Sequence, residues 1–274
     1  MSWARLRRPT GMTHYATTSQ GDRIAYDLYG GSGPALVFVA GAGPYRAVDP
    51  ITTPTARLVA DAGLTAVVFD RLGRGESPAE GRLDLDRELA AVAAMIEVAG
   101  GSAVLCGHSS GCSISLAAAD AGLPVDGLAL WEAPLGDPAD KTRTWADAIV
   151  RHLDAEDYVG ATEKYMEDMP PEWLAGMKSA PDWPESAKSS RSQRADAQSL
   201  AWAQQALEDR ALAIMVPVLA MYGTATFPEM PVAAASIVAA VVKGTEKEMP
   251  GAMHSWEPEP MAAELAEFAR ACAG

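Results

Sequence analysis

Short, almost continuously apolar runs recur along the chain and alternate with amphipathic segments. Five of these runs are typical of strands buried on both faces of a parallel sheet: residues 35–40, 65–69, 102–106, 125–131 and 216–222. A shorter strand is expected at 245–249, and two strands at 13–18 and 23–29 form a predicted hairpin. The segments between them have apolar residues at helical spacing: 55–62, 83–99, 112–121, 232–242 and 258–271. This order predicts an α/β fold with a mostly parallel, eight-stranded sheet flanked by helices.

The alternation stops between residues 136 and 212. This segment is rich in charged residues and helix formers, and prolines at 170, 171, 181 and 184 divide it into several helices. It also carries tryptophans at 145, 173, 183 and 202. We therefore expect a helical insertion over 136–212, placed on a core that is built from residues 1–135 and 213–274.

The segment Gly107-His108-Ser109-Ser110-Gly111 lies between the apolar run at 102–106 and the helix-compatible run at 112–121. A strand followed by G-x-S-x-G and then by a helix is typical of a very tight turn. The serine in such a turn has strained dihedrals, and the flanking glycines avoid Cβ clashes. The serine hydroxyl then projects above the sheet edge, in front of free N–H groups at the helix N-terminus. The pattern predicts a nucleophile elbow at Ser109; an ordinary turn of small residues is the alternative.

Composition and charge restrict the kinds of partner that the protein is expected to bind. The formal net charge of −14 argues against nucleic acid or an anionic membrane, and no apolar run has the length of a membrane span. The basic residues 1–8 have no apolar segment after them, so we expect a loose extension rather than a secretory signal. Cys106, Cys112 and Cys272 have no metal-ligand spacing and fit buried thiols in a reducing cytoplasm. We expect a cytoplasmic protein with a small-molecule substrate, without metal or cofactor.

The elbow and a second segment, Asp70-Arg71-Leu72-Gly73-Arg74-Gly75-Glu76-Ser77, resemble the α/β-hydrolase fold superfamily, and the resemblance covers nearly all of the chain. The second segment is similar to the D-x-x-G-x-G-x-S turn of that superfamily, which is structural, so Asp70 is not expected to be catalytic. The insertion at 136–212 matches the position of the cap domain that covers the nucleophile. The resemblance implies a cap-bearing serine hydrolase.

A serine at its ordinary pKa needs a base to take its proton. His14 falls in the predicted hairpin, and His152 falls in the insertion, where a surface position on a helix is expected. His108 is adjacent to Ser109, but neighbouring side chains at a sharp elbow point in different directions, so we expect it to pack or to support the residues of the site. His254 lies between the last strand and the closing helix, in the loop where the resemblance places the family's base.

The acid is out of its usual place. The family commonly has it in the loop after the strand at 216–222, where this chain has Thr226 or a neighbour in the position of the aspartate. Glu132, at the end of the strand at 125–131, is the favoured candidate, because haloalkane dehalogenases, among other members, place the acid there. Glu229, Asp137 or no acid at all are alternatives, and Glu132 could instead cap the insertion or bind an arginine. A dehalogenase itself is not expected, because that reaction needs a carboxylate at position 109.

An oxyanion hole requires two N–H donors. One is expected from the backbone of Ser110, directly after the nucleophile. The other is expected from the loop after the strand at 35–40, with Ala42 as the best match and Gly41 as the next. The family often has His-Gly at the start of this loop; this chain has Ala40-Gly41, which keeps the backbone donor.

Taken together, these residues imply a serine hydrolase that acts on a small ester or related acyl compound, through an acyl-enzyme on Ser109 with His254 as base. Two alternatives remain. One is a non-hydrolytic enzyme on the same fold, such as a lyase, a perhydrolase-type haloperoxidase or a biosynthetic tailoring enzyme. The other is a ligand-binding protein whose triad is degenerate.

Overall fold

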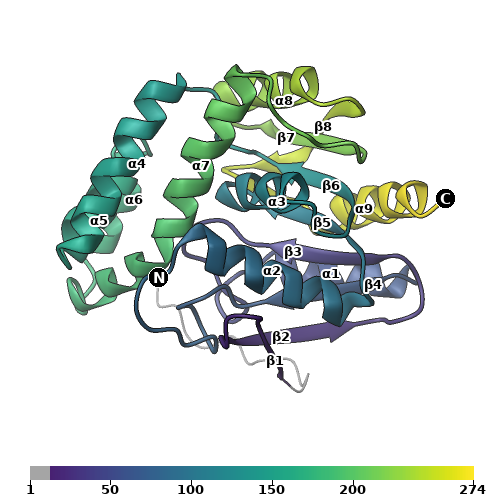
Figure 1. The fold of residues 1–274 in the computed structure, drawn as a ribbon, viewed down its shortest axis with the longest axis horizontal. Coiled ribbons are helices and arrows are strands. Elements are labelled where there is room, and N and C mark those ends of the chain that lie inside the picture. The colour runs from purple at the N-terminus through teal and green to yellow at the C-terminus, as the bar shows by residue number, and fades with distance from the viewer. Residues whose placement is uncertain (1–12) are drawn as a thin grey trace.

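A nine-stranded sheet forms the centre of the molecule in the computed structural model, which describes residues 13–274 (Figure 1). The strand order is β1-β2-β4-β3-β5-β6-β7-β8-β9. The strands are β1 (His14–Thr17), β2 (Arg23–Tyr29), β3 (Ala35–Val39), β4 (Thr65–Phe69), β5 (Ala103–His108), β6 (Val125–Trp131), β7 (Val218–Ala225), β8 (Gly244–Ala252) and β9 (Ser255–Trp256). The predicted extension at residues 1–8 lies outside the described part of the chain.

The strands from β3 to β8 pair in parallel, and β1, β2 and β9 pair antiparallel with their neighbours. The sequence predicts this mostly parallel sheet with eight strands, one fewer than the structure has. The additional strand, β9, has two residues and pairs with the end of β8. A segment this short has no hydrophobic period that could reveal it in the sequence.

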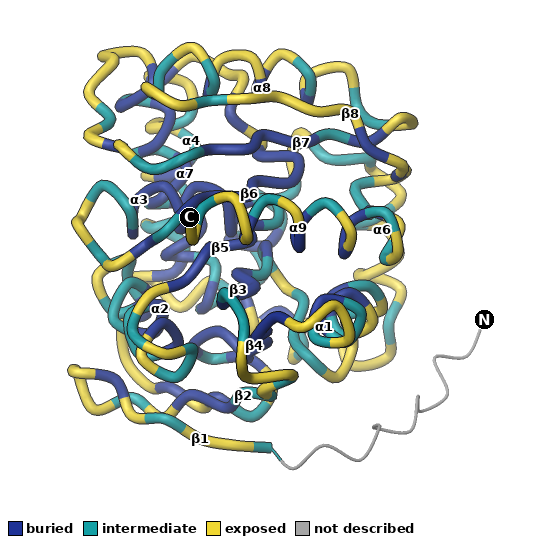
Figure 2. The backbone as a smooth tube through the Cα atoms, turned by 90° about the vertical axis from the view of Figure 1, so that its right-hand side faces the viewer, coloured by how far each residue is buried: buried dark blue, intermediate teal, exposed yellow. Residues whose placement is uncertain are grey.

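Helices cover both faces of the sheet, which is why the central strands are apolar along their whole length. On one face α1 (Thr52–Asp61) and α9 (Pro258–Cys272) enclose a core cluster, and on the other α2 (Leu85–Ala99), α3 (Ser110–Asp120) and α8 (Glu229–Ala240) enclose a second. Figure 2 shows β5 and β6 buried through the middle of the molecule. Ser109 follows the carboxyl end of β5, and Glu132 follows the carboxyl end of β6.

A helical insertion separates β6 from β7. It consists of α4 (Ala139–Asp154), α5 (Tyr158–Tyr165), α6 (Pro171–Lys178), the 3-10 helix η1 (Glu185–Ser192) and α7 (Gln193–Glu208). In Figure 1, α4, α5 and α6 stand to one side, and α7 runs between them and the rest of the molecule. Leu200 and Leu207 of α7 join the core beside the sheet, whereas Ala197 joins the small core of α4 and α5. Helix α7 therefore belongs to both parts of the protein.

Candidate active site

Ser109 occupies the turn between β5 and α3. Its φ is 55° and its ψ is −126°, a strained conformation for a residue with a side chain. A Cβ at Gly107 would lie 2.7 Å from the Cα of Cys112, and a Cβ at Gly111 would lie 2.1 Å from the carbonyl oxygen of Val39. Both glycines are therefore required by close backbone approach, and the turn has the geometry predicted for an elbow.

The structure brings His254 and Glu132 together beside this turn. His108 and Trp131 are register partners in adjacent parallel strands, so Ser109 and Glu132 follow the ends of neighbouring strands. The Nδ1 of His254 donates to Oε2 of Glu132 at 2.6 Å, and the backbone N–H of Gly223 donates to Oε1 at 2.9 Å. Since a carboxylate only accepts, Nδ1 carries a proton, and in the neutral form of the ring Nε2 has none and can act as a base.

The Glu132 carboxyl is ionised in this environment. Burial alone would raise its pKa, but the hydrogen bond from His254, the nearby hydroxyl of Thr226 and the backbone N–H of Gly223 together outweigh burial and hold the pKa below its ordinary value. The hydroxyl of Thr226 lies near the same carboxylate and favours its charged form, yet it is buried without a properly aligned hydrogen-bond partner among the described residues.

The other predicted acids lie elsewhere. Glu229 is exposed at the start of α8, and Asp137 pairs with Lys141 on the surface at 3.0 Å. Of the candidates weighed in the sequence, Glu132 is the one in contact with His254. Its backbone φ of 47° is also positive, so the acid follows β6 in a conformation that few residues with side chains adopt.

His108 holds the backbone of the base in place. Its Nε2 donates to the carbonyl oxygen of His254 at 2.9 Å, and the indole of Trp131 donates to the same oxygen at 3.3 Å. The His108 and His254 rings lie 5.0 Å apart, between centroids. Burial, with the neighbouring His254, lowers the pKa of His108 to about 4, so the ring stays neutral. The two donors stabilise the positive φ of 68° at His254.

We expect His108→Gln to reduce the acid sensitivity of the fold. In the wild type, unfolded His108 binds a proton below its ordinary pKa of about 6.5, while the folded ring does so only near pH 4. The unfolded state therefore binds more protons between these values, and stability falls as the pH falls through this window. Glutamine keeps an N–H donor at a comparable position but does not titrate.

Urea unfolding between pH 4 and 7 measures this effect. His14→Gln, at an exposed histidine of β1, is the control and should keep the wild-type slope. An unchanged slope in His108→Gln would remove His108 as its source.

The predicted oxyanion segments meet at Ser109. A Cβ at Gly41 would lie 2.8 Å from the Cβ of Ser109 and 3.5 Å from its Oγ, so the loop after β3 passes directly against the nucleophile. Ser110 is the first residue of α3, where N–H groups have no partner within the helix. The loop with Gly41 and Ala42 and the first turn of α3 thus both border Ser109.

Asp70 has the structural role expected for it. Its carboxylate is buried and accepts the backbone N–H groups of Arg46 and Glu76, each at 2.8 Å. The same segment contributes Arg71 and Arg74, for which the sequence suggested no role. Both guanidinium groups donate to carbonyl oxygens of the loop after β3.

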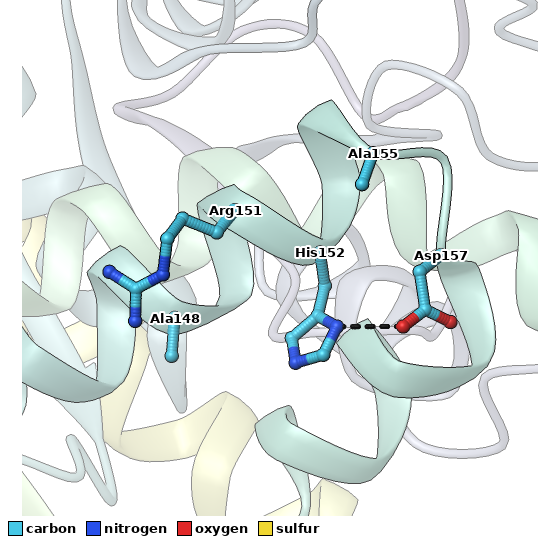
Figure 3. A pocket seen from close by; sticks show the side chains of 5 residues that line it. All are labelled: Ala148, Arg151, His152, Ala155 and Asp157. Carbon is cyan, nitrogen blue, oxygen red and sulfur yellow. Dashed lines mark hydrogen bonds and ion pairs between the residues drawn. The ribbon is translucent and has the colours of Figure 1, made fainter.

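His152 lies away from these residues. It lines a surface hollow of about 180 Å³ together with Ala148, Arg151, Ala155 and Asp157, all from the helical insertion (Figure 3). Its Nδ1 contacts the Asp157 carboxylate at 2.8 Å. Within residues 13–274, no group of His, Cys, Asp and Glu side chains is arranged to hold a metal ion, and no helix is long and apolar enough to span a membrane.

A strained serine between a parallel strand and a helix, with a histidine–carboxylate pair beside it, defines the class of α/β proteins with a nucleophile elbow. The model of the alpha/beta hydrolase family matches residues 36–269, and the chain belongs to this family. No curated protein sequence matches it significantly.

Solved structures with the same fold include hydrolases and esterases. An alpha/beta hydrolase from Sphaerobacter thermophilus is 28% identical with a TM-score of 0.73, covering 93% of this chain and 99% of that one. A thermophilic esterase from Thermogutta terrifontis is 18% identical with a TM-score of 0.62, covering 96% and 100%. A candidate non-heme bromoperoxidase from Mycobacterium tuberculosis is 19% identical with a TM-score of 0.61, covering 97% and 99%.

Proposed function

We propose that the protein is a serine hydrolase that cleaves a small carboxylic ester or related acyl compound. One observation carries this proposal: the 2.6 Å contact between His254 Nδ1 and Glu132 Oε2 beside the strained Ser109. That contact orients a neutral imidazole with Nε2 unprotonated, and a hydroxyl nucleophile needs such a base. The esterases among the structural neighbours are consistent with this reaction class.

In the first half of the reaction, Ser109 Oγ attacks the carbonyl carbon while His254 Nε2 takes its proton. The negative charge on Glu132 stabilises the imidazolium, and the backbone N–H groups of Ala42 and Ser110 receive the charge that develops on the carbonyl oxygen. The tetrahedral intermediate then expels the alcohol, which takes the proton from His254. The product of this half is an ester between the acyl group and Ser109.

In the second half, water releases the acyl group. His254 takes a proton from the water as its oxygen attacks the acyl carbon, and the same two backbone donors hold the new oxyanion. When this intermediate collapses, the proton on His254 returns to Ser109 Oγ and the carboxylic acid leaves. The site is then restored without any cofactor.

Aromatic rings extend from the base toward the helical insertion and favour an apolar group in the substrate. The Phe227 ring lies 6.4 Å from the His254 ring, and the Trp173 ring of α6 lies 6.2 Å from Phe227, between centroids. Helix α6 buries none of its residues, so Trp173 is only half-buried against Phe227. An acyl or alcohol group that contacts these rings would be apolar or aromatic.

We therefore expect Trp173→Ala to raise the KM for phenyl-substituted esters about tenfold, the equivalent of about 1.4 kcal/mol of lost contact, with little change for acetates. Steady-state kinetics on matched ester pairs measures the ratio. Met177→Ala, on the same helix and exposed, is the control and should leave it unchanged. Equal effects on both ester classes would place Trp173 in packing rather than in substrate recognition.

Turnover of a panel of p-nitrophenyl esters from acetate to octanoate tests the proposed activity. We expect hydrolysis by the wild-type protein and loss of at least 10³-fold in kcat for His254→Ala, because the base is removed. A folded wild-type protein that hydrolyses none of these esters would contradict hydrolysis. Serine labelling without turnover would favour the non-hydrolytic enzyme or the binding protein.

A further inference from the structure

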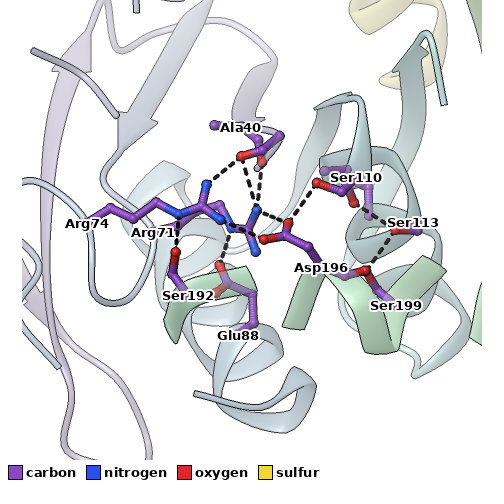
Figure 4. Close-up of polar contacts among 12 residues, drawn as sticks. Ala40, Arg71, Arg74, Glu88, Ser110, Ser113, Ser192, Asp196 and Ser199 are labelled. Atoms are coloured by element: carbon purple, nitrogen blue, oxygen red, sulfur yellow. Dashed lines mark hydrogen bonds and ion pairs between the residues drawn. The ribbon is translucent and has the colours of Figure 1, made fainter. Parts of the chain in front are cut away.

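Two arginines and a carboxylate form a buried charge network beside the elbow (Figure 4). Asp196, on α7 of the helical insertion, is fully buried and accepts from Nη1 of Arg71 at 2.6 Å and from Nη2 of Arg74 at 2.7 Å. Arg71 also pairs with Glu88 of α2 at 2.8 Å through Nε. Burial alone would raise the pKa of Asp196, but the two guanidinium groups outweigh burial and keep the pKa low, so the carboxylate is charged.

The same guanidinium groups bind the loop that borders Ser109. Arg71 Nη1 donates to the carbonyl oxygen of Ala40 at 3.0 Å and to that of Gly41 at 3.4 Å, and Arg74 Nη1 donates to the Gly41 carbonyl through a short contact. The carbonyl of Gly41 and the N–H of Ala42 belong to one peptide group. In a trans peptide they point in opposite directions, so donors that fix the oxygen also fix the direction of the N–H.

Two positive charges beside a peptide oxygen also change how strongly the N–H of the same peptide group donates. They draw electron density toward the oxygen and make the opposite N–H a stronger donor, as in any chain of polarised hydrogen bonds at low dielectric. The backbone of Gly41 already lies against Ser109. The N–H of Ala42, the donor expected for the oxyanion hole, is thus both oriented and strengthened by the arginines.

Asp196 also contacts Ser110, the residue that carries the second expected oxyanion donor. Its Oδ1 accepts the hydroxyl of Ser110 at 2.7 Å, and Ser110 carries the second expected donor on its backbone N–H. One carboxylate on α7 is therefore joined to both donor segments, directly to Ser110 and through Arg71 and Arg74 to the Gly41–Ala42 peptide. Buried ion networks are often no more stabilising than apolar replacements of similar volume, so stability alone does not account for this arrangement.

We propose that Asp196, Arg71 and Arg74 are positioning residues for the oxyanion hole, and that α7 of the insertion is a fixed part of the catalytic machinery rather than only a cover over the substrate. This inference rests on the proposed acyl-transfer function. Its signature is selective: the residues stabilise the charge that develops on the carbonyl oxygen and contribute little to binding of the neutral substrate.

The test compares Asp196→Asn with Glu88→Gln. Both replace a buried carboxylate that pairs with Arg71 by its amide, but Glu88 contacts only Arg71 Nε and neither oxyanion segment. We expect Asp196→Asn to lower kcat by about 10- to 100-fold with KM changed less than threefold, below the 10²–10³-fold cost of removing a whole oxyanion donor. Affinity for an alkyl trifluoromethyl ketone, which forms a tetrahedral oxyanion on a reactive serine, should fall by the same factor. Glu88→Gln should destabilise the fold with both values near wild type.

Two results would leave the network with a structural role only: equal losses of kcat and of ketone affinity in both variants, or no loss in a folded Asp196→Asn. In either case ester turnover by the wild type would still support the proposed function. A wild type that neither turns over esters nor binds the ketone would overturn both. If Asp196→Asn does not fold, Arg74→Lys applies the same test, because lysine keeps the charge but cannot hold the Gly41 carbonyl and Asp196 together. Its kcat and ketone affinity should fall in parallel about tenfold; an unchanged ketone affinity would contradict the inference.

Discussion

Replacing Ser109 with alanine is expected to lower kcat for ester hydrolysis by about 10⁵- to 10⁶-fold, with KM close to wild type. The covalent route through Ser109 is lost entirely, and the remaining groups can only stabilise direct attack by water, which leaves a small residual rate. Ester turnover by the purified variant, measured at high enzyme concentration, checks the size of the loss.

Ser115→Ala is the matched control for this prediction. Ser115 is also a buried serine close to the elbow, but its hydroxyl donates to the carbonyl oxygen of Gly111 within α3 at 2.7 Å. We expect the control to keep kcat within about threefold of wild type. Substantial turnover by Ser109→Ala, free of contaminating esterase, would mean that the nucleophile lies elsewhere.

Glu132→Gln is expected to lower kcat by about 10⁴-fold, the cost seen when a triad carboxylate becomes an amide. The glutamine is similar in shape, but its NH₂ group would donate where the carboxylate accepted. His254 would then accept at Nδ1 and carry its proton on Nε2, where it cannot take the proton of Ser109. The charge that stabilises the imidazolium is lost as well. Turnover and thermal unfolding of the same sample separate the catalytic effect from misfolding.

Thr226→Asp in the Glu132→Gln background tests the displacement of the acid. The hydroxyl of Thr226 is buried near Glu132 and lacks an aligned partner, so a carboxylate there would lie within reach of the same imidazole. We expect it to restore kcat by about 10- to 100-fold over the single variant, part of the 10⁴-fold loss. Thr224→Asp, whose hydroxyl instead donates to Gly251 at 3.4 Å, should restore nothing. Equal recovery by both would refute a specific site at Thr226.

Much of the fold follows from local pattern, because buried parallel strands must be apolar throughout. The strands β3 to β7 therefore coincide closely with the apolar runs. Helix boundaries are less predictable, since caps shift them: α1 begins at Thr52 rather than at residue 55, with Asp49 accepting the N–H groups of Ile51 and Thr52 at 2.9 and 3.0 Å. Two-residue β9 depends on the path of β8 and has no pattern of its own.

The site divides in the same way. Ser109 is visible in a short motif. Asp196 carries no such signal: its contact with Arg71 joins residues 125 positions apart, from a helix whose packing on the core is not encoded in any local period. The bond from His108 to the carbonyl of His254 likewise spans 146 positions. Residues that position the site therefore become visible only in three dimensions.

Reaction with a fluorophosphonate, followed by mass spectrometry of the digested protein, tests the central claim most directly. We expect one phosphonyl adduct on Ser109 in the wild type, no adduct in Ser109→Ala, and labelling slowed by at least 10²-fold in His254→Ala because the base no longer takes the serine proton. Adduct on Ser109 would show that the strained hydroxyl beside the His254–Glu132 pair is an activated nucleophile. A folded wild-type protein that stays unlabelled, or is labelled equally without Ser109, would contradict the account.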